Sequence, residues 1–421
     1  SAAMGFAEAA KHQKADFQTV CIVGDGALSG GIAYEALNNM GYNQTDITII
    51  LNDNKMGISH NVGAMFEYLK RLSDVAADDT GRRSIGTIFE KLGFKYYGPI
   101  DGHNFEELIH HLNEMKHIKG PKILHVLTDK GRGVEYMESD KVTWHEHAAF
   151  DVPSGIAKAK MDKTKPQHPA IESIAVSTLI KLAEKDPTII GLTAAMATGT
   201  GMVKFGEKFP TRFYDVGIAE EHAITFSAGL AAEGMKPVAC IYSPFLQRAF
   251  DQIMHDVASM NLPVRMLVPK AAITGDGWTQ GGILDMSYLR VIPNVVVAAP
   301  KDENELQHMV KMAIDYDAGP IAVRYPKGQG SGMTLDTEFK KIPIGKAELI
   351  KDGKDVTLLA IGWEVQDAIK AAAELEKQGI HAAVINARFA KPLDEEMILK
   401  YAKLTGKIIT MEENTLIGGF G

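Results

Sequence analysis

Two short polar motifs follow apolar segments near the start of the chain. Asp25, between two glycines, comes directly after the apolar run 20–23, and Asn54 comes shortly after the run 47–51. The distance between them is enough for one crossover from a strand through a helix to a parallel strand, which brings both side chains to one sheet edge. A carboxylate and an amide oxygen beside a glycine-rich helix start suit a hard cation that holds a diphosphate.

An ordinary turn is the competing interpretation of the first motif. Asp and Gly are favoured in turns for backbone reasons, so a Gly-Asp-Gly sequence alone says little about ligands. The second polar motif, at the matching distance and also after an apolar run, is what favours a diphosphate site.

A second constellation begins where a strand pattern changes to a helix pattern, at Glu220. A carboxylate there lies at the carboxyl end of a strand, where α/β proteins form ligand sites. The alternative is that Glu220 only stabilises the first turn of its helix, since acidic residues are favoured in that turn.

The segment 241–252 places aromatic, polar and basic side chains after another strand end. An aromatic ring such as Phe245 and a carboxylate such as Glu220 are what an aminopyrimidine needs, one for stacking and one for proton exchange. An isolated Phe is more often a core residue, so Phe245 carries weight only together with the neighbouring motifs.

Alternating strand and helix patterns must position these residues. The pattern predicts α/β architecture with parallel sheets covered by helices, in three units in series. We expect helices at 31–39, 105–116, 171–185, 220–232, 303–316 and 365–378, and strands at 123–127, 189–193, 238–242, 264–268, 295–298, 356–361, 382–386 and 407–411. Polar connections at 151–168 and 329–345 predict domains at 1–150, 169–328 and 346–421.

Composition excludes several classes of protein. Apolar residues make up 45% of the 421 residues and charged residues 23%, an ordinary globular balance. The net charge of −8 and the lack of a basic tract argue against a nucleic-acid partner. No apolar run approaches the length of a membrane helix, so we expect no membrane partner. Two cysteines, both in apolar runs, fit a reduced protein of the cytoplasm.

Eight sequence blocks then establish a family resemblance. They are GDGALSGG, NDNKMGIS, LGFKYYGPIDGHN, KGRG, FYDVGIAEEHAITFSAGLA, IYSPFLQRAFDQIMHDV, VRYPKG and MEEN, in this order. The series resembles the transketolase-like thiamine diphosphate enzymes and, among them, the 1-deoxy-D-xylulose-5-phosphate synthase family. The family order of diphosphate-binding, pyrimidine-binding and transketolase C-terminal domains fits the three predicted units. The chain starts in a helical pattern and stops in a glycine turn, so we expect a fragment with an incomplete third domain.

The resemblance implies cofactor and metal roles for named residues. Thiamine diphosphate and Mg²⁺ are the implied cofactors. The implied metal ligands are the side chains of Asp25 and Asn54 and the carbonyl of Met56. The other implied cofactor contacts are Gly24, Gly26, Ala27, Phe245 and Arg248, and the implied catalytic residues are Glu220, which exchanges a proton with the pyrimidine, and His145.

The resemblance also implies a substrate site and a reaction. The implied substrate contacts are Tyr242, Lys270, Asp276, Gln280 and Arg324. Lys270 stands where the family usually has Arg, and Gln280 replaces a family His, so that position keeps hydrogen bonding but cannot carry a proton. The implied reaction joins pyruvate to D-glyceraldehyde 3-phosphate with loss of CO₂, giving a precursor of isoprenoids, thiamine and pyridoxal. A homodimer is implied as well.

Three alternatives stay open. The chain could be a transketolase, which shares the cofactor and domain order but releases no CO₂. It could be an inactive relative that only binds the cofactor or a partner, which Gln280 and the fragment would favour. The sequence His145-Glu146-His147 could also hold zinc, although a third ligand at clear spacing is missing.

Overall fold

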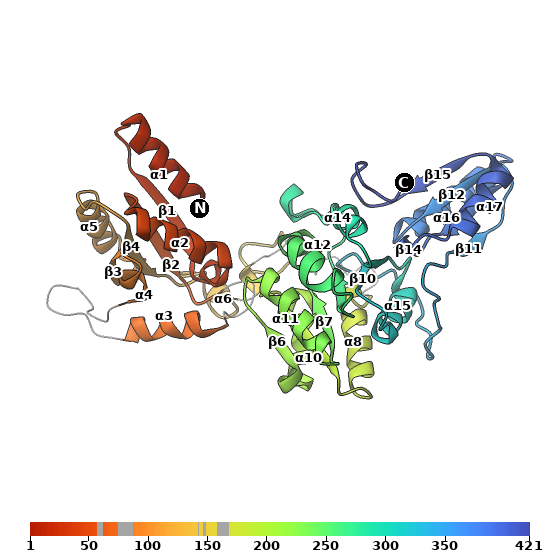
Figure 1. The fold of residues 1–421 in the computed structure, drawn as a ribbon, viewed down its shortest axis with the longest axis horizontal. Coiled ribbons are helices and arrows are strands. Elements are labelled where there is room, and N and C mark those ends of the chain that lie inside the picture. The colour runs from red at the N-terminus through yellow and green to blue at the C-terminus, as the bar shows by residue number, and fades with distance from the viewer. Residues whose placement is uncertain (57–61, 75–86, 142, 146–148, 158–167) are drawn as a thin grey trace. The chain divides into compact units, whose positions relative to one another are not determined.

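The computed structural model describes residues 1–421 except 57–61, 75–86, 142, 146–148 and 158–167 (Figure 1). The chain forms two compact units, which we describe one at a time. The first consists of residues 1–164 with the short segment 216–219, and the second consists of 165–215 and 220–421. The predicted boundaries at 150, 169, 328 and 346 stay predictions.

The first unit is built on a four-stranded parallel sheet in the order β1-β2-β4-β3. The strands are β1 (Thr19–Gly24), β2 (Ile47–Asp53), β3 (Lys95–Asp101) and β4 (Lys122–Leu127). Gly24 of β1 lies opposite Asn52 of β2, so the two strands end together. This register confirms the expected parallel pair with both polar motifs at one sheet edge.

Helices cover both faces of that sheet. Side chains of α1 (Ala2–Gln13), α2 (Gly31–Asn43) and α3 (Ala64–Asp74) pack on one face, and α5 (Phe105–Met115) packs on the other (Figure 1). Asn104 caps α5 by accepting the Glu107 N–H, as its position before an acidic first turn predicts. The shorter elements are η1 (Asp25–Ser29), α4 (Ile88–Lys91), α6 (Glu135–Glu138) and η2 (Thr143–His145).

The second unit contains a seven-stranded sheet in the order β14-β9-β10-β8-β7-β5-β6. Its strands are β5 (Ile189–Thr193), β6 (Phe213–Asp215), β7 (Lys236–Cys240), β8 (Arg265–Val268), β9 (Val296–Ala298), β10 (Ile321–Arg324) and β14 (Phe389–Lys391). All pairs are parallel except β14 with β9. The core is formed mainly by the sheet with α8 (Ile171–Ala183), α10 (Val203–Lys208) and α15 (Glu303–Asp315).

A second sheet of four strands follows in the same unit, in the order β11-β13-β12-β15. The strands are β11 (Glu348–Lys351), β12 (Val356–Ala360), β13 (Ala382–Asn386) and β15 (Ile408–Met411), and α16 (Glu364–Lys377) and α17 (Glu395–Thr405) accompany them. Between β13 and α17 the chain contributes β14 to the seven-stranded sheet, where Phe389 lies opposite Ala298. The predicted third unit therefore shares a strand with the second.

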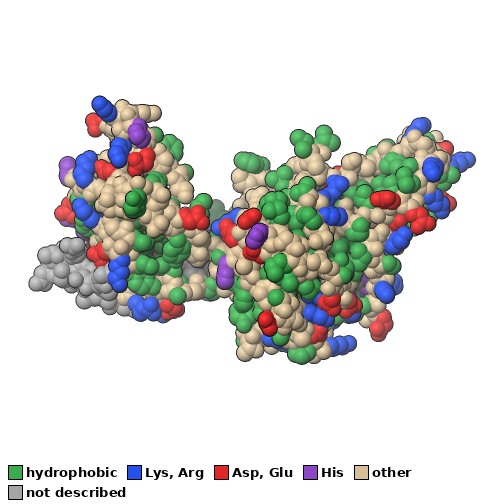
Figure 2. All heavy atoms as spheres, in the orientation of Figure 1, with side chains coloured by type: hydrophobic (Ala, Val, Ile, Leu, Met, Phe, Trp, Pro, Cys, Tyr) green, Lys and Arg blue, Asp and Glu red, His purple; other side chains and the backbone are tan. Residues whose placement is uncertain are grey.

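The remaining elements of the second unit surround the strand ends. They are α9 (Ala197–Thr200), η3 (Pro210–Arg212), α11 (Glu220–Ala232), α12 (Ser243–Leu246), η4 (Gln247–Ala249), α13 (Phe250–Gln252), the π-helical turn η5 (Ile253–Ala258), η6 (Trp278–Gln280) and α14 (Asp285–Val291). Across the described ranges, no helix is both long and apolar enough to cross a membrane. Charges of both signs are interspersed over the face seen in Figure 2.

Candidate functional site

The first group of predicted site residues lies where β1 passes into η1. Asp25 begins η1 and is only 6% exposed, and its Oδ1 accepts the N–H of Gly26 at 2.9 Å. Gly24 and Ala27 lie on either side of this turn. Burial and the neighbouring carboxylate of Asp53 raise the pKa of Asp25 to about 7. A buried carboxyl beside a second carboxylate is a group that a cation stabilises in its charged form.

The turn after β2 carries the other oxygen donors. Asn54 Oδ1 accepts the N–H of Met56 at 3.0 Å, and Asp53 Oδ1 accepts the N–H of Lys55 at 3.2 Å. Lys55 adopts a left-handed backbone with φ of 61°, which makes the turn sharp. The chain therefore places amide, carbonyl and carboxylate oxygens at adjacent strand ends, a donor set that fits a hard divalent cation.

Asp53 is itself paired across the sheet. Its Oδ2 lies 2.9 Å from His125 Nε2, and the other ring nitrogen of His125 lies 2.6 Å from the hydroxyl of Tyr96. Burial acts to raise the pKa of Asp53, but the hydrogen bond and charge of His125 outweigh it and lower that pKa. Asp53, His125 and Tyr96 are not among the site residues predicted from the sequence. A histidine within a strand of buried residues is the sequence feature that could have indicated these hydrogen bonds.

His145 ends the short η2 turn and contacts Lys130, whose amine lies against its Nδ1. Burial lowers the pKa of Lys130. Glu146 and His147, the other residues of the zinc alternative, lie outside the described residues. Within the described ranges, no group of three His, Cys, Asp or Glu side chains is arranged to hold a metal ion.

In the second unit, Glu220 is the first residue of α11 and is 3% exposed. Its carboxylate pairs with Arg248, which also lies 3.3 Å from Glu221. Burial raises the pKa of Glu220 above its usual value, and the Arg248 charge acts in the opposite direction. A buried carboxyl whose pKa is raised can hold a proton nearer to neutral pH than an ordinary glutamate, as proton exchange requires.

The structure brings Phe245 and Tyr242 together at the start of α12. Their ring centroids are 5.9 Å apart and the planes are tilted by 36°. Tyr242 is buried and Phe245 is half-buried. Phe245 therefore retains an accessible face, as stacking against a flat ring requires, whereas Tyr242 is enclosed by protein.

Four of the predicted substrate residues form one cluster. The amine of Lys270 lies 2.8 Å from Asp276 Oδ2 and 3.4 Å from Gln280 Oε1, and it lies 5.4 Å from the centre of the Tyr242 ring. Lys270 has a left-handed backbone with φ of 63°, a conformation that turns the chain after β8. Its hydrogen bond and charge lower the pKa of Asp276.

Lys327 belongs to the same cluster, although it is not among the predicted substrate residues. Its amine lies 5.0 Å from the centre of the Tyr242 ring, and its charge also lowers the pKa of Asp276. The side chain is exposed and makes no ion pair within the described ranges. Its place directly after the Arg-Tyr-Pro sequence, which begins at the last residue of β10, is the signal that could have indicated it.

The fifth predicted substrate residue, Arg324, is embedded in the protein. It is 2% exposed, its Nε donates to Asp285 Oδ2 at 2.8 Å, and its Nη2 donates to carbonyl oxygens, of which Ala271 O at 3.0 Å is the nearest. Arg324 also lies beside Glu413, whose pKa is raised to about 7 by burial. The Arg324 side chain thus forms a largely buried group of charged residues with Asp285 and Glu413.

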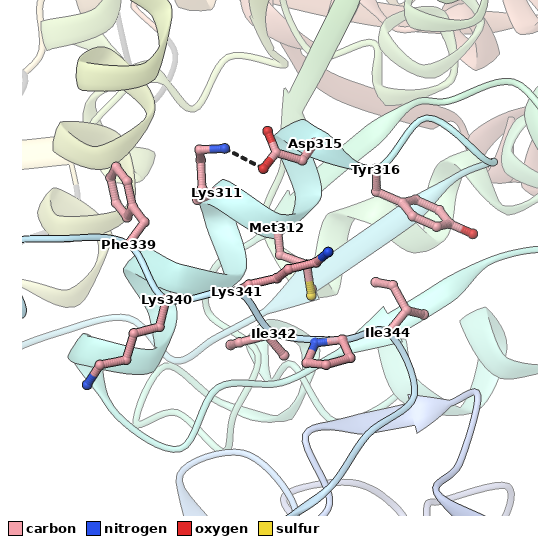
Figure 3. A pocket seen from close by; sticks show the side chains of 10 residues that line it. Lys311, Met312, Asp315, Tyr316, Phe339, Lys340, Lys341, Ile342 and Ile344 are labelled. Carbon is pink, nitrogen blue, oxygen red and sulfur yellow. Dashed lines mark hydrogen bonds and ion pairs between the residues drawn. The ribbon is translucent and has the colours of Figure 1, made fainter.

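A cavity of about 480 Å³ elsewhere in the second unit contains none of the predicted site residues. It lies between the end of α15 and the segment 339–344, and Figure 3 shows Lys311 paired with Asp315 at its rim. Aliphatic and lysine side chains line most of it, without an arrangement that suggests chemistry. The predicted site residues therefore lie at the strand ends and not in this cavity.

Comparison with known proteins assigns the family. Residues 1–85 and 78–128 match the 1-deoxy-D-xylulose-5-phosphate synthase family model, residues 168–331 the pyrimidine-binding domain of transketolase, and residues 345–421 the transketolase C-terminal domain. The 1-deoxy-D-xylulose-5-phosphate synthase of Gloeobacter violaceus is 48% identical over 100% of this chain and 72% of its own length. That of Heliobacterium modesticaldum is 47% identical over 100% and 69%.

Solved structures agree on the fold. A split gene transketolase, described as an inactive β4 tetramer, superposes with a TM-score of 0.53 at 31% identity over 60% of this chain and 81% of its own. Transketolase from Campylobacter jejuni superposes with a TM-score of 0.52 at 21% identity, over 98% and 74%. The transketolase-like α/β fold predicted from the sequence is thereby confirmed. The chain belongs to the 1-deoxy-D-xylulose-5-phosphate synthase family, a family of transketolase-type, thiamine diphosphate-dependent transferases.

Proposed function

We propose that the chain joins pyruvate to D-glyceraldehyde 3-phosphate, with loss of CO₂, to give 1-deoxy-D-xylulose 5-phosphate. The observation that supports this most is the pair Glu220 and Phe245, a buried carboxyl with a raised pKa and an accessible aromatic ring in the unit that matches a pyrimidine-binding domain. Bound thiamine diphosphate would supply the nucleophilic carbon and the electron sink for decarboxylation.

The first unit would hold the diphosphate end and a Mg²⁺ ion. Asp25 and Asn54 would bind the ion through side-chain oxygens and Met56 through its carbonyl, while the Gly24–Ala27 turn would approach the diphosphate. The supporting observation is the burial of Asp25 next to Asp53, because a divalent cation offsets both the burial and the neighbouring carboxylate that raise the pKa of Asp25.

The second unit would handle the proton and the acceptor. Glu220 would exchange a proton with the pyrimidine nitrogen, and Arg248 would hold the carboxylate in place through their ion pair. Phe245 would stack on the ring. The lysine cluster formed by Lys270 and Lys327 would attract the acceptor phosphate. Asp276 and Gln280 would fix Lys270, and both amines lie near the Tyr242 ring.

His145 would move a proton near the substrate, a task suited to a side chain that titrates near neutral pH. Its Nδ1 lies against the amine of Lys130, and this contact would orient the ring. The predicted homodimer and the predicted cytoplasmic location stay predictions.

The test is an incubation of the protein with thiamine diphosphate, Mg²⁺, pyruvate and D-glyceraldehyde 3-phosphate. We expect CO₂ release coupled to formation of the five-carbon phosphate. Transfer of a two-carbon unit from a ketose phosphate without CO₂ would identify a transketolase instead. Cofactor binding without any decarboxylation would identify an inactive binding protein.

A further inference from the structure

A buried row of hydrogen bonds crosses three neighbouring strands of the first unit. It starts at Tyr96 on β3, passes through His125 on β4 and ends at Asp53, the last residue of β2. The three side chains are between 0% and 3% exposed. Tyr96 is held further by a stacked contact with Phe89, whose ring centroid lies 5.8 Å away.

Two hydrogen bonds join the three side chains of this row. A carboxylate can only accept, so Asp53 Oδ2 accepts the Nε2–H of His125. The Nδ1 atom of His125 and the hydroxyl oxygen of Tyr96 lie 2.6 Å apart and share the second hydrogen bond. Every polar side-chain atom in the row is thus satisfied, which buried polar groups require.

The row ends at the turn that carries the proposed metal ligands. Asp53 uses its second oxygen, Oδ1, to accept the Lys55 N–H, and Lys55 is the residue with the left-handed backbone. The same turn presents Asn54 and Met56, joined by their own hydrogen bond. Fixing the Asp53 carboxylate therefore fixes the backbone between these ligands.

An apolar core would stabilise the sheet at lower cost than a buried polar row, because each polar group must be desolvated. We propose that Tyr96, His125 and Asp53 are positioning residues for a divalent cation, which hold the Asn54–Met56 turn next to Asp25 in its binding geometry. The inference rests on the proposed function, since it takes Asp25, Asn54 and Met56 as the ligands. Partners that orient metal ligands typically change metal affinity 10- to 100-fold when they are removed.

The experiment measures Mn²⁺ binding to the protein in the presence of thiamine diphosphate by electron paramagnetic resonance. Mn²⁺ prefers the same oxygen donors as Mg²⁺ and gives a signal that is independent of turnover. We expect the Tyr96→Phe variant, which loses one hydroxyl, to bind Mn²⁺ about 10-fold more weakly. Tyr42→Phe is the matched control, because Tyr42 lies on the same unit and is 88% exposed.

Two further variants test the histidine. His125→Leu removes both hydrogen bonds and should weaken Mn²⁺ binding about 100-fold. His125→Gln keeps an N–H that can reach Asp53, so it should lose less affinity than His125→Leu. The thermal midpoint of each apoprotein is measured in parallel, and Tyr96→Phe keeps the test valid if His125→Leu fails to fold.

A lowered thermal midpoint with unchanged Mn²⁺ affinity would overturn the inference, because a purely structural row predicts that result. Equal affinities of His125→Gln and His125→Leu would also overturn it. If the wild-type protein binds Mn²⁺ and Tyr96→Phe binds it equally well, only the positioning role fails. If the wild-type protein does not bind Mn²⁺ at all, the metal assignment fails and the inference fails with it.

Discussion

The two groups of site residues differ in how their charges are balanced. In the first unit, Asp25 and Asp53 crowd two carboxylates together, and burial with this crowding raises the pKa of Asp25 to about 7. In the second unit, Glu220 is paired with Arg248 and Lys270 with Asp276. The first arrangement is suited to a cation, whereas the second is suited to a ring and a phosphate that enter a preformed set of pairs.

This difference has a physical reason. A divalent cation lowers the free energy of crowded carboxylates by direct coordination, so the protein can leave negative charge concentrated there. A carboxyl that exchanges protons must instead have a pKa near the pH at which the enzyme works. Burial raises that pKa and an arginine partner lowers it, so the two together adjust its value.

The largest effect is expected from Glu220→Ala. Loss of a positioned proton-exchange group typically lowers kcat by 10²- to 10⁴-fold, so we expect a fall of about 10³-fold with the fold intact by circular dichroism. Glu221→Ala is the matched control, because Glu221 is the next residue of α11 and also pairs with Arg248. A kcat near the wild-type value in Glu220→Ala would remove Glu220 from the mechanism.

Asp25→Asn should have opposite effects on metal binding and on the apoprotein. We expect Mg²⁺ affinity in the presence of thiamine diphosphate to fall about 100-fold, measured by calorimetry, because a charged ligand is lost. Since the folded pKa of Asp25 is raised, its contribution to apoprotein stability is lost as pH rises through about 7. The Asn variant should therefore have a higher thermal midpoint than wild type at pH 8.

Asp16→Asn provides the control for that experiment, because Asp16 is an exposed carboxylate of the same unit. It should change neither Mg²⁺ affinity nor the pH dependence of the thermal midpoint. If Asp25→Asn binds Mg²⁺ as tightly as wild type, Asp25 is not a metal ligand, and the first group of residues is not suited to a cation in the way described.

Lys327→Gln tests the lysine cluster of the second unit. Removing one charged partner of a phosphate should raise KM for D-glyceraldehyde 3-phosphate about 10-fold, with a much smaller change for unphosphorylated D-glyceraldehyde. The matched control is Lys354→Gln, an exposed lysine in the turn between β11 and β12. Equal changes in KM for the two acceptors would show that Lys327 does not contact the phosphate.

The smallest effect concerns Glu413, another carboxyl of the second unit whose pKa is raised. Burial, with Glu364 and Asp285 nearby, raises its pKa to about 7 in spite of Arg324. A raised carboxyl pKa means that stability is greatest below about pH 4.5 and is lost as pH rises through 7. The free energy of unfolding of Glu413→Gln at pH 8 should therefore be about 1–2 kcal/mol higher than that of wild type.

Urea unfolding at pH 5 and pH 8 measures that difference. The two proteins should be closer in stability at pH 5, where most of the Glu413 carboxyl is protonated in the folded state. Glu395→Gln, an exposed glutamate at the start of α17, should show no such pH dependence. If the difference in stability between Glu413→Gln and wild type is the same at pH 5 and pH 8, the pKa of Glu413 is not raised.

Local patterns were enough to predict many elements. The helix at 220–232 and the strands at 189–193 and 382–386 match the structure residue for residue, because each is a contiguous apolar or capped segment with clear limits. The short strands β10, β11 and β14 and the helix α17 were not predicted. Strands of three or four residues carry too little periodicity to identify without their partners.

Side-chain partners could not be predicted in the same way. The substrate contact of Arg324 stays a prediction, whereas its burial and its pairing with Asp285 depend on residues far away in the chain. Lys327 and His125 were assigned no role, since an exposed lysine and a strand histidine look ordinary until Tyr242 and Asp53 are placed beside them.

By itself, the sequence determined the family, the α/β architecture and the strand-end location of Asp25, Asn54 and Glu220, because these follow from motifs and from contiguous apolar periodicity. Only the tertiary structure decided which charges are paired, that β14 joins the seven-stranded sheet, and that Tyr96, His125 and Asp53 form one row. The physical reason is that hydrogen bonds and ion pairs between distant segments depend on strand order and register, which local patterns do not encode.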